Sequence, residues 1–148
     1  MKFTTAILVL FLSVAPSNQF RTDMWKGIAL LKGTSYSWGG ESLRGADCSG
    51  AMYYLFKLAG RPIPRMTARR MYVVYGKQPT LCWKNLKEFN LVWWTITPNR
   101  QYGHVGLAEG DSEHHLWQAG VKSGFSRKQF IKGGYWDRYY AGSGNIGN

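Results

Sequence analysis

The segment from residue 36 to residue 59, YSWGGESLRGADCSGAMYYLFKLA, decides the fold of this 148-residue chain. Its first half is rich in glycine and indicates a sharp turn. From Ala51 onward, apolar residues recur at three- and four-residue spacing, as they do on one face of a helix. Gly60 follows where such a helix is expected to end. Cys48 is therefore expected in, or just before, the first turn of this helix.

Cys48 has the surroundings of a thiol nucleophile. The free amide N–H groups and the positive dipole end at a helix start stabilise a thiolate, so we expect a lowered pKa for Cys48. The same amides are suited to binding an oxyanion. Fifty-six residues later, His104 stands in a strand-like run, residues 103–107, as a base. A lone cysteine is more often a small buried hydrophobe, so the prediction rests on turn, cysteine, helix and histidine occurring in this order.

A third catalytic group follows from strand geometry. If a three-residue loop joins the strands on either side of residues 110–112, His104 faces Gln118 across a hairpin. Opposed Cβ atoms lie about 5 Å apart, which brings the Gln118 carbonyl within reach of an imidazole N–H. A four-residue loop would place Ala119 opposite, with Gln118 still the nearest polar side chain. His115 is the rival orienter, but it points to the other face of the strand.

These residues resemble the NlpC-type papain-fold cysteine peptidases, which cut the peptide stems of bacterial peptidoglycan. The resemblance runs from about residue 29 to residue 140 and rests on four motifs: Tyr36-Ser37-Trp38-Gly39-Gly40, Asp47-Cys48-Ser49-Gly50, Pro64-Arg65 with Thr67, and His104-Val105-Gly106. It implies a papain-like α+β domain, in which a helix bearing the cysteine packs on a small antiparallel sheet bearing the base. The order of cysteine before histidine separates the chain from circularly permuted relatives.

The resemblance also assigns roles around the nucleophile. It implies that Tyr36 lies near the oxyanion, and that Asp47, Ser49 and Arg65 hold the substrate stem. From the residues alone, Tyr36 is equally a buried hydroxyl and Ser49 equally a helix-start cap. Asp47 fits a structural role and a substrate role equally well.

The predicted activity is hydrolysis of a stem-peptide amide through a Cys48 acyl-enzyme, with His104 as base and Gln118 as its orienter. The resemblance points to the bond between γ-D-glutamyl and the diamino acid, and to a bacterial or phage origin. Relatives usually carry Gln in place of Arg70 and Gly-Asp-Leu-Val-Phe at residues 90–94, so the bond specificity stays open. Two alternatives also stay open: an amidase or acyltransferase with the same dyad, and an envelope or virion protein that binds the wall without cutting it.

Length and composition fit one globular domain. Hydrophobic residues make up 45% of the chain and aromatic residues 16%, enough for a buried core. We expect the peptidase domain at residues 18–141 and a flexible tail at 142–148. Residues 1–17 combine an N-terminal lysine, an apolar run and small residues near the end, the layout of a secretion signal or membrane-targeting segment. This layout predicts export to the periplasm, the medium or a virion.

The net charge of +11 indicates an anionic partner. Such a field attracts wall polymers, anionic membranes and nucleic acid alike. The sequence carries no helix-turn-helix, zinc-finger or RNA-stacking pattern, so we expect no specific nucleic acid as a partner. The resemblance implies bacterial peptidoglycan as the partner.

Cys48 and Cys82 are the two cysteines of the chain. A disulfide between them would oxidise the nucleophile, so we expect free thiols, with Cys82 packed in a strand. Cysteine and histidine spacing gives no zinc-type pair except His114-His115, whose side chains point to opposite faces if that stretch is a strand. We therefore predict no metal and no other cofactor.

The remaining elements follow from periodicity and turn residues. Helices are expected at 23–31, capped by Thr22 or Asp23, and at 67–75, in addition to 51–59. Strands are expected at 81–83, 91–96, 102–109, 114–119 and 135–141. Helices first and strands later predict the α+β class.

Overall fold

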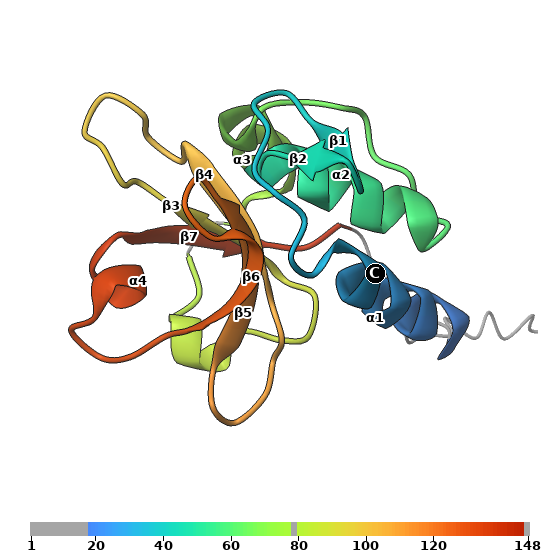
Figure 1. Cartoon of the computed structure of the whole chain (residues 1–148). Coiled ribbons are helices and arrows are strands. Elements are labelled where there is room, and N and C mark those ends of the chain that lie inside the picture. Colours follow the sequence, from blue (N-terminus) through green and yellow to red (C-terminus); the bar gives the residue numbers. More distant parts are fainter. Residues whose placement is uncertain (1–17, 78–79, 147–148) are drawn as a thin grey trace, which may run out of the picture.

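The computed structural model describes residues 18–77 and 80–146. Helices α1 (Asn18–Leu31), α2 (Cys48–Leu58) and α3 (Ala68–Tyr75) come first in the chain and gather on one side of an antiparallel sheet (Figure 1). The predicted α+β class is therefore confirmed.

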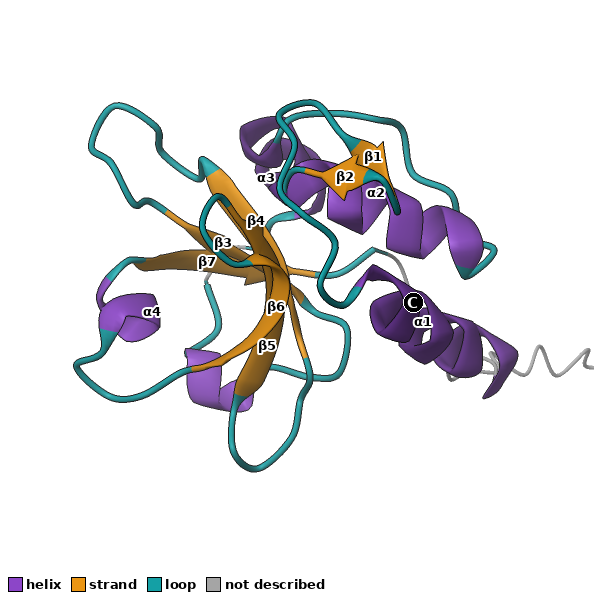
Figure 2. Ribbon diagram, viewed as in Figure 1, coloured by secondary structure: helices purple, strands orange, loops and turns teal. Residues whose placement is uncertain are grey.

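The sheet has five strands in the order β6-β5-β4-β3-β7, and every neighbouring pair is antiparallel (Figure 2). The strands are β3 (Leu91–Trp94), β4 (His104–Ala108), β5 (His115–Gly120), β6 (Gly124–Gln129) and β7 (Tyr140–Gly144). A separate ribbon of β1 (Glu41–Ser42) and β2 (Gly45–Ala46) leads into the start of α2.

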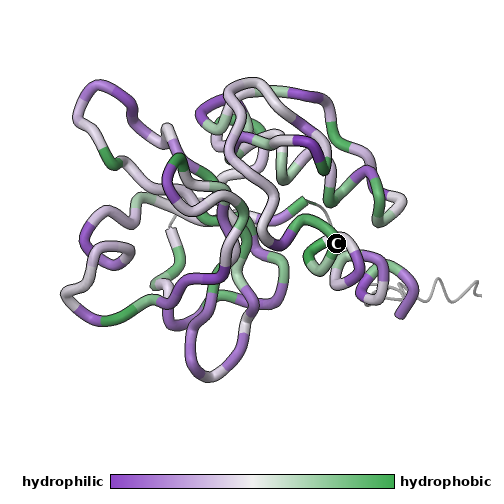
Figure 3. The backbone as a smooth tube through the Cα atoms, viewed as in Figure 1, coloured by the Kyte–Doolittle hydropathy of each residue, from purple (hydrophilic) through white to green (hydrophobic). Residues whose placement is uncertain are grey.

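Two apolar clusters pack on the opposite faces of the sheet. The larger lies between the helices and the sheet, where Leu55 of α2 and Leu107 of β4 are fully buried. The smaller joins the other face to a 3-10 turn, η1 (Trp83–Asn85), and a short helix, α4 (Tyr135–Arg138). Because both faces are covered, β3 is buried at all four positions and carries no polar residue. The loops that project furthest from the sheet are mainly hydrophilic (Figure 3).

The three predicted helices exist, with shifted starts. α1 begins at Asn18, before Thr22, and the Thr22 hydroxyl donates back to the Asn18 carbonyl (2.8 Å) within the helix instead of capping it. α3 begins at Ala68, one residue later than predicted, because the Thr67 hydroxyl caps it by accepting the Arg70 N–H (3.2 Å). α2 begins at Cys48, three residues before the predicted start at Ala51, so Cys48 lies in the first turn as expected.

Two strand predictions are wrong in part or in full. Residues 81–83 do not form a strand: the Cys82 carbonyl accepts the Asn85 N–H (2.9 Å), closing the 3-10 turn, and Cys82 is exposed instead of packed. The predicted strand 135–141 begins as helix α4, because the Asp137 carboxylate accepts both the Gly133 N–H (2.7 Å) and the Trp83 indole N–H (2.7 Å).

The end of the sheet also differs from expectation. Strand β6 was not predicted, since Gly124–Gln129 is mostly polar and lacks β-branched residues, yet it pairs along all six positions with β5. Residues 142–144 belong to β7 and are buried, so the predicted flexible tail at 142–148 is wrong for these three residues. The predicted targeting segment, residues 1–17, lies outside the described residues. Within the described ranges, every helix is too short or too polar to cross a bilayer.

Candidate active site

Cys48 is the first residue of α2, and its position depends on the turn before it. The Asp47 carboxylate caps the helix by accepting the Gly50 N–H (2.6 Å), and it also accepts the Gly39 N–H (2.9 Å) from the preceding loop. The two backbones pass so closely that a Cβ on Gly50 would collide with the Gly40 carbonyl oxygen. Because residues 40 and 50 are both glycine, the loop of residues 37–40 packs directly against the start of α2.

Asp47, Ser49 and Arg65 form one hydrogen-bonded network beside Cys48. The Arg65 guanidinium donates to both carboxylate oxygens of Asp47 (3.0 and 3.2 Å), to the Ser49 hydroxyl (2.8 Å) and to Glu41 (2.9 Å). Ser49 in turn donates to Asp47 (3.2 Å) and is buried. The structure thus brings the predicted residues together, and it gives Asp47, rather than Ser49, the capping role.

His104 opens β4, and its imidazole Nε2 lies 3.0 Å from the Gln118 Oε1. The predicted contact is confirmed, but the predicted register is wrong: Gly106, not His104, pairs with Gln118. The register differs from the expected one by two residues, which preserves the face of the strand, so Gln118 reaches His104 diagonally. A Cβ on Gly106 would lie 2.6 Å from the Trp117 carbonyl oxygen and 3.2 Å from the Gln118 Cβ, so this approach requires glycine.

The orientation of the Gln118 amide determines the tautomer of His104. The Gln118 Nε2 donates to the hydroxyls of Ser126 (3.3 Å) and Ser123 (3.4 Å), so its carbonyl oxygen faces the imidazole. A carbonyl oxygen only accepts, and the His104 Nε2 must therefore carry the proton. The lone pair of Nδ1 is then free to act as a base.

Two tryptophans that sequence reasoning missed hold the imidazole from the side. Trp94 on β3 pairs directly with His104 and its ring centroid lies 5.6 Å from the imidazole, while Trp136 on α4 stacks at 6.0 Å. The Trp94 indole N–H donates to the Trp136 carbonyl (3.0 Å), which joins the two. Residues 90–94, which include Trp94, depart from the family pattern in the sequence, but no local signal placed Trp136 near His104.

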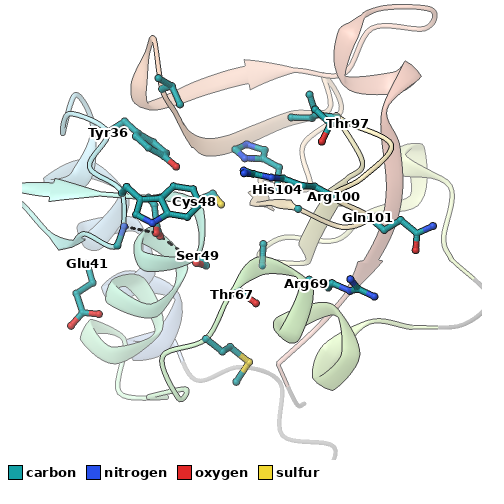
Figure 4. Close-up of a pocket in the computed structure, with 18 of the residues that line it drawn as sticks. Tyr36, Glu41, Cys48, Ser49, Thr67, Arg69, Thr97, Arg100, Gln101 and His104 are labelled. Atoms are coloured by element: carbon teal, nitrogen blue, oxygen red, sulfur yellow. Dashed lines mark hydrogen bonds between the residues drawn. The ribbon is translucent and has the colours of Figure 1, made fainter.

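Cys48 and His104 line the same cleft, which has a volume of about 850 Å³. Cys48 comes from α2 and His104 from the sheet opposite, with the Tyr36 hydroxyl directed toward the space between them (Figure 4). The Cys48 sulfur accepts a hydrogen bond from the backbone of Val105, the residue after His104. Asp47, Ser49 and Arg65 also line this cleft, whereas Gln118 is buried behind the imidazole.

Burial shifts the pKa of each of the three titratable groups at the centre of the site, which are Cys48, His104 and Tyr36. It raises the pKa of the Cys48 thiol, outweighing the Val105 hydrogen bond that acts in the opposite direction, so the expected lowering does not occur. It lowers the pKa of His104 to about 4, against a smaller opposite effect of Gln118. Burial also raises the pKa of Tyr36, with the neighbouring Cys48 and Asp47 adding to it. At neutral pH the centre therefore holds a thiol, a neutral imidazole and a protonated phenol.

His115 belongs to a separate charged cluster. Its Nδ1 lies 2.5 Å from an Asp111 carboxylate oxygen, and Glu109 completes a set whose ligand atoms all lie within 4.8 Å of one another. Cysteine and histidine spacing in the sequence gave no indication of this grouping. Arg127 already forms an ion pair with Glu109 in the cluster, which supplies the positive charge that a metal ion would bring.

Comparison with known proteins places the chain in a family. Residues 33–144, more than half of the chain, match the model of the NlpC/P60 family. The chain belongs to this family.

Two relatives are named as endopeptidases. The chain is 32% identical over 120 residues to murein DD-endopeptidase MepH of Escherichia coli K12, covering 77% of this chain and 41% of the relative. It is 29% identical over 115 residues to the probable endopeptidase p60 of Listeria monocytogenes, covering 77% of this chain and 22% of the relative. The chain thus spans less than half the length of either relative.

Solved structures confirm the expected fold. A Staphylococcus aureus protein of the same family, similar to a lipoprotein, superposes with a TM-score of 0.69 at 19% identity, covering 89% of this chain and 43% of that one. The peptidoglycan hydrolase RipB of Mycobacterium tuberculosis gives 0.66 at 22% identity, covering 91% and 68%.

Proposed function

We propose that this chain is a cell-wall hydrolase, a cysteine endopeptidase that cleaves amide bonds in peptidoglycan stem peptides. One observation carries the proposal: Cys48 and His104 face the same cleft from opposite walls, and Gln118 holds the imidazole with Nδ1 free. A thiol, an imidazole and a neutral amide in this order are the parts of a papain-type site. Membership of the NlpC/P60 family supports the same activity.

The reaction begins with a neutral thiol and a neutral imidazole. His104 Nδ1 takes the Cys48 proton as the sulfur attacks the amide carbonyl. The imidazolium then gives this proton to the leaving amine, the C–N bond breaks, and a thioester links the acyl half to Cys48. A water molecule attacks the thioester after losing a proton to His104, and the proton returns to the Cys48 sulfur as the acid product leaves.

The oxyanion forms near the start of α2. The Cys48 backbone N–H and the Tyr36 hydroxyl are its donors in this proposal, and the raised pKa of Tyr36 keeps the phenol protonated for that role. Asp47, Ser49 and Arg65 shape the adjoining wall, where they contact the stem of the bound peptide.

The substrate is proposed from the relatives and from charge. The E. coli relative is named a murein endopeptidase, and the net charge of +11 favours association with anionic wall polymers or membranes. Export through residues 1–17 would bring the protein to this substrate. The bond between γ-D-glutamyl and the diamino acid is the proposed target, although the relative's name is that of a DD-endopeptidase.

Mass spectrometry of purified peptidoglycan after incubation with the full chain tests this function. Fragments with a new γ-D-glutamyl carboxyl end and a new diamino-acid amine support the proposal, and fragments cut elsewhere in the stem reassign the bond. Release of intact stems from the glycan would indicate an amidase. Binding without any new fragment would contradict the enzymatic role.

A further inference from the structure

The charged side chains that line the cleft separate by sign. On one side of Cys48, Arg65 is paired with both Glu41 (2.9 Å) and Asp47 (3.0 Å), so this trio carries a net charge of −1. Arg69 and Arg100 also line the cleft, and in the described parts of the chain neither forms an ion pair with a carboxylate. Glu41 and Arg69 lie on opposite sides of Cys48 (Figure 4).

A tyrosine stack places the two arginines on neighbouring elements. Tyr72, one turn after Arg69 on α3, stacks on Tyr102 of the β3–β4 loop with ring centroids 3.6 Å apart and an interplanar angle of 8°. Tyr102 follows Arg100 by two residues, and the Arg100 carbonyl accepts the Gly103 N–H (2.9 Å) in a closed turn. The stack therefore holds the Arg100 turn against the helix that carries Arg69.

The two arginines have different surroundings. The Arg100 guanidinium lies 5.8 Å from the centroid of Trp38, an exposed ring on the other wall of the cleft, and its charge lowers the pKa of Tyr36 against the effect of burial. Arg69 lies in the first turn of α3, which contains no acidic residue and whose dipole is positive at this end.

We propose that Arg69 and Arg100 form a carboxylate-binding subsite on the His104 side of the cleft, which holds a carboxylate in the amine half of the substrate. The inference rests on the proposed function. Cys48 binds the acyl half and His104 protonates the leaving amine, so the amine half lies on the side of His104. Guanidinium groups bind carboxylates through paired, charge-assisted hydrogen bonds.

Two synthetic tripeptides test the subsite. Both are L-Ala-γ-D-Glu-L-Lys, and they differ only in the lysine end, which is a free carboxylate in one and a carboxamide in the other. The wild-type protein should cleave the carboxylate peptide with a kcat/KM about ten-fold or more above that of the carboxamide. Arg69→Gln and Arg100→Gln should each reduce this ratio, and the double variant should bring it close to one.

Arg70→Gln is the matched control, because Arg70 is exposed on the same helix and does not line the cleft. It changes the net charge equally and should leave the ratio unaltered. An equal fall with Arg70→Gln would show a general effect of charge and would overturn the subsite.

A binding measurement separates this inference from the proposed function. Calorimetry of the Cys48→Ala protein with the two intact tripeptides requires no cleavage. The carboxylate peptide should bind more tightly, and the two arginine substitutions should abolish the difference. Equal binding of both peptides, or binding of neither, overturns the subsite even if the wild-type protein digests peptidoglycan. Tighter binding of the carboxylate peptide without cleavage of any wall fragment keeps the subsite and rejects the hydrolase.

Discussion

The imidazole Nε2 of His104 lies 3.0 Å from the Oε1 of Gln118, although Gln118 pairs across the strands with Gly106. The contact is diagonal, and it exists because glycine leaves the space that a side chain at residue 106 would fill. His104 is thus held by a side chain two residues away from the position directly opposite it on β5.

Replacing Gln118 should impair turnover without preventing substrate binding. Gln118→Ala removes the acceptor of the Nε2 proton, so both the tautomer and the ring orientation are lost, and kcat should fall by about 10- to 1,000-fold. Steady-state kinetics with an unchanged melting transition checks this. His115→Ala is the control and should retain nearly full turnover, since His115 binds Asp111. A large fall in kcat for His115→Ala, together with an unchanged kcat for Gln118→Ala, would assign the orienting role to His115.

On the acidic side, kcat/KM should begin to fall only at an unusually low pH. Because burial lowers the pKa of His104 to about 4, the imidazole stays neutral and able to accept a proton down to that pH. The kcat/KM should therefore hold from neutral pH to about pH 5 and fall as the pH passes through 4. Circular dichroism at each pH controls for unfolding. A half-maximal point near 6.5, the ordinary value for histidine, would contradict the burial of this group.

The same shift makes stability depend on pH. In the unfolded chain His104 takes up its proton near pH 6.5, whereas in the folded protein it does so near 4. Between these two pH values the unfolded state thus binds more protons than the folded state. The stability that neutral His104 contributes is complete above pH 6.5 and is lost progressively as the pH falls toward 4. Denaturant unfolding of His104→Gln should show a smaller loss over this window, by up to about 3 kcal/mol. If the free energy of unfolding changed with pH in the same way for the wild type and His104→Gln, this prediction would be refuted.

The Asp47 cap should contribute more to stability than an ordinary helix cap. Asp47→Ala removes the acceptor of the Gly50 N–H and also two of the hydrogen bonds that Arg65 donates, although Arg65 keeps its contacts with Glu41 and Ser49. Thr67→Ala, at the cap of α3, removes a single hydrogen bond and should cost about 1 kcal/mol. Urea unfolding should show a larger loss for Asp47→Ala, roughly 2 kcal/mol or more. Equal losses would mean that the Arg65 network adds nothing to the cap.

Local patterns in the sequence predicted much of the site, and long-range contacts account for the rest. The glycines around Cys48 and the apolar spacing after it placed Cys48 in, or just before, the first turn of α2, although the cap is Asp47 and not Ser49. The contact between His104 and Gln118 was predicted correctly although the predicted register was wrong by two residues, because side chains alternate between the faces of a strand with a period of two. By contrast, α4 forms where Asp137 meets Trp83, 54 residues earlier in the chain, and no local pattern reveals such a contact.

The central claim is that the Cys48 sulfur is the nucleophile, and the most direct measurement compares Cys48→Ala with Cys82→Ala on purified peptidoglycan. Both cysteines are free thiols, and Cys82 is exposed and does not line the cleft, so its substitution is the matched control. Mass spectrometry should detect cleaved stem fragments with the wild-type and Cys82→Ala proteins and none with Cys48→Ala, whose melting temperature should stay close to that of the wild type. Fragments released by a folded Cys48→Ala protein would contradict the account.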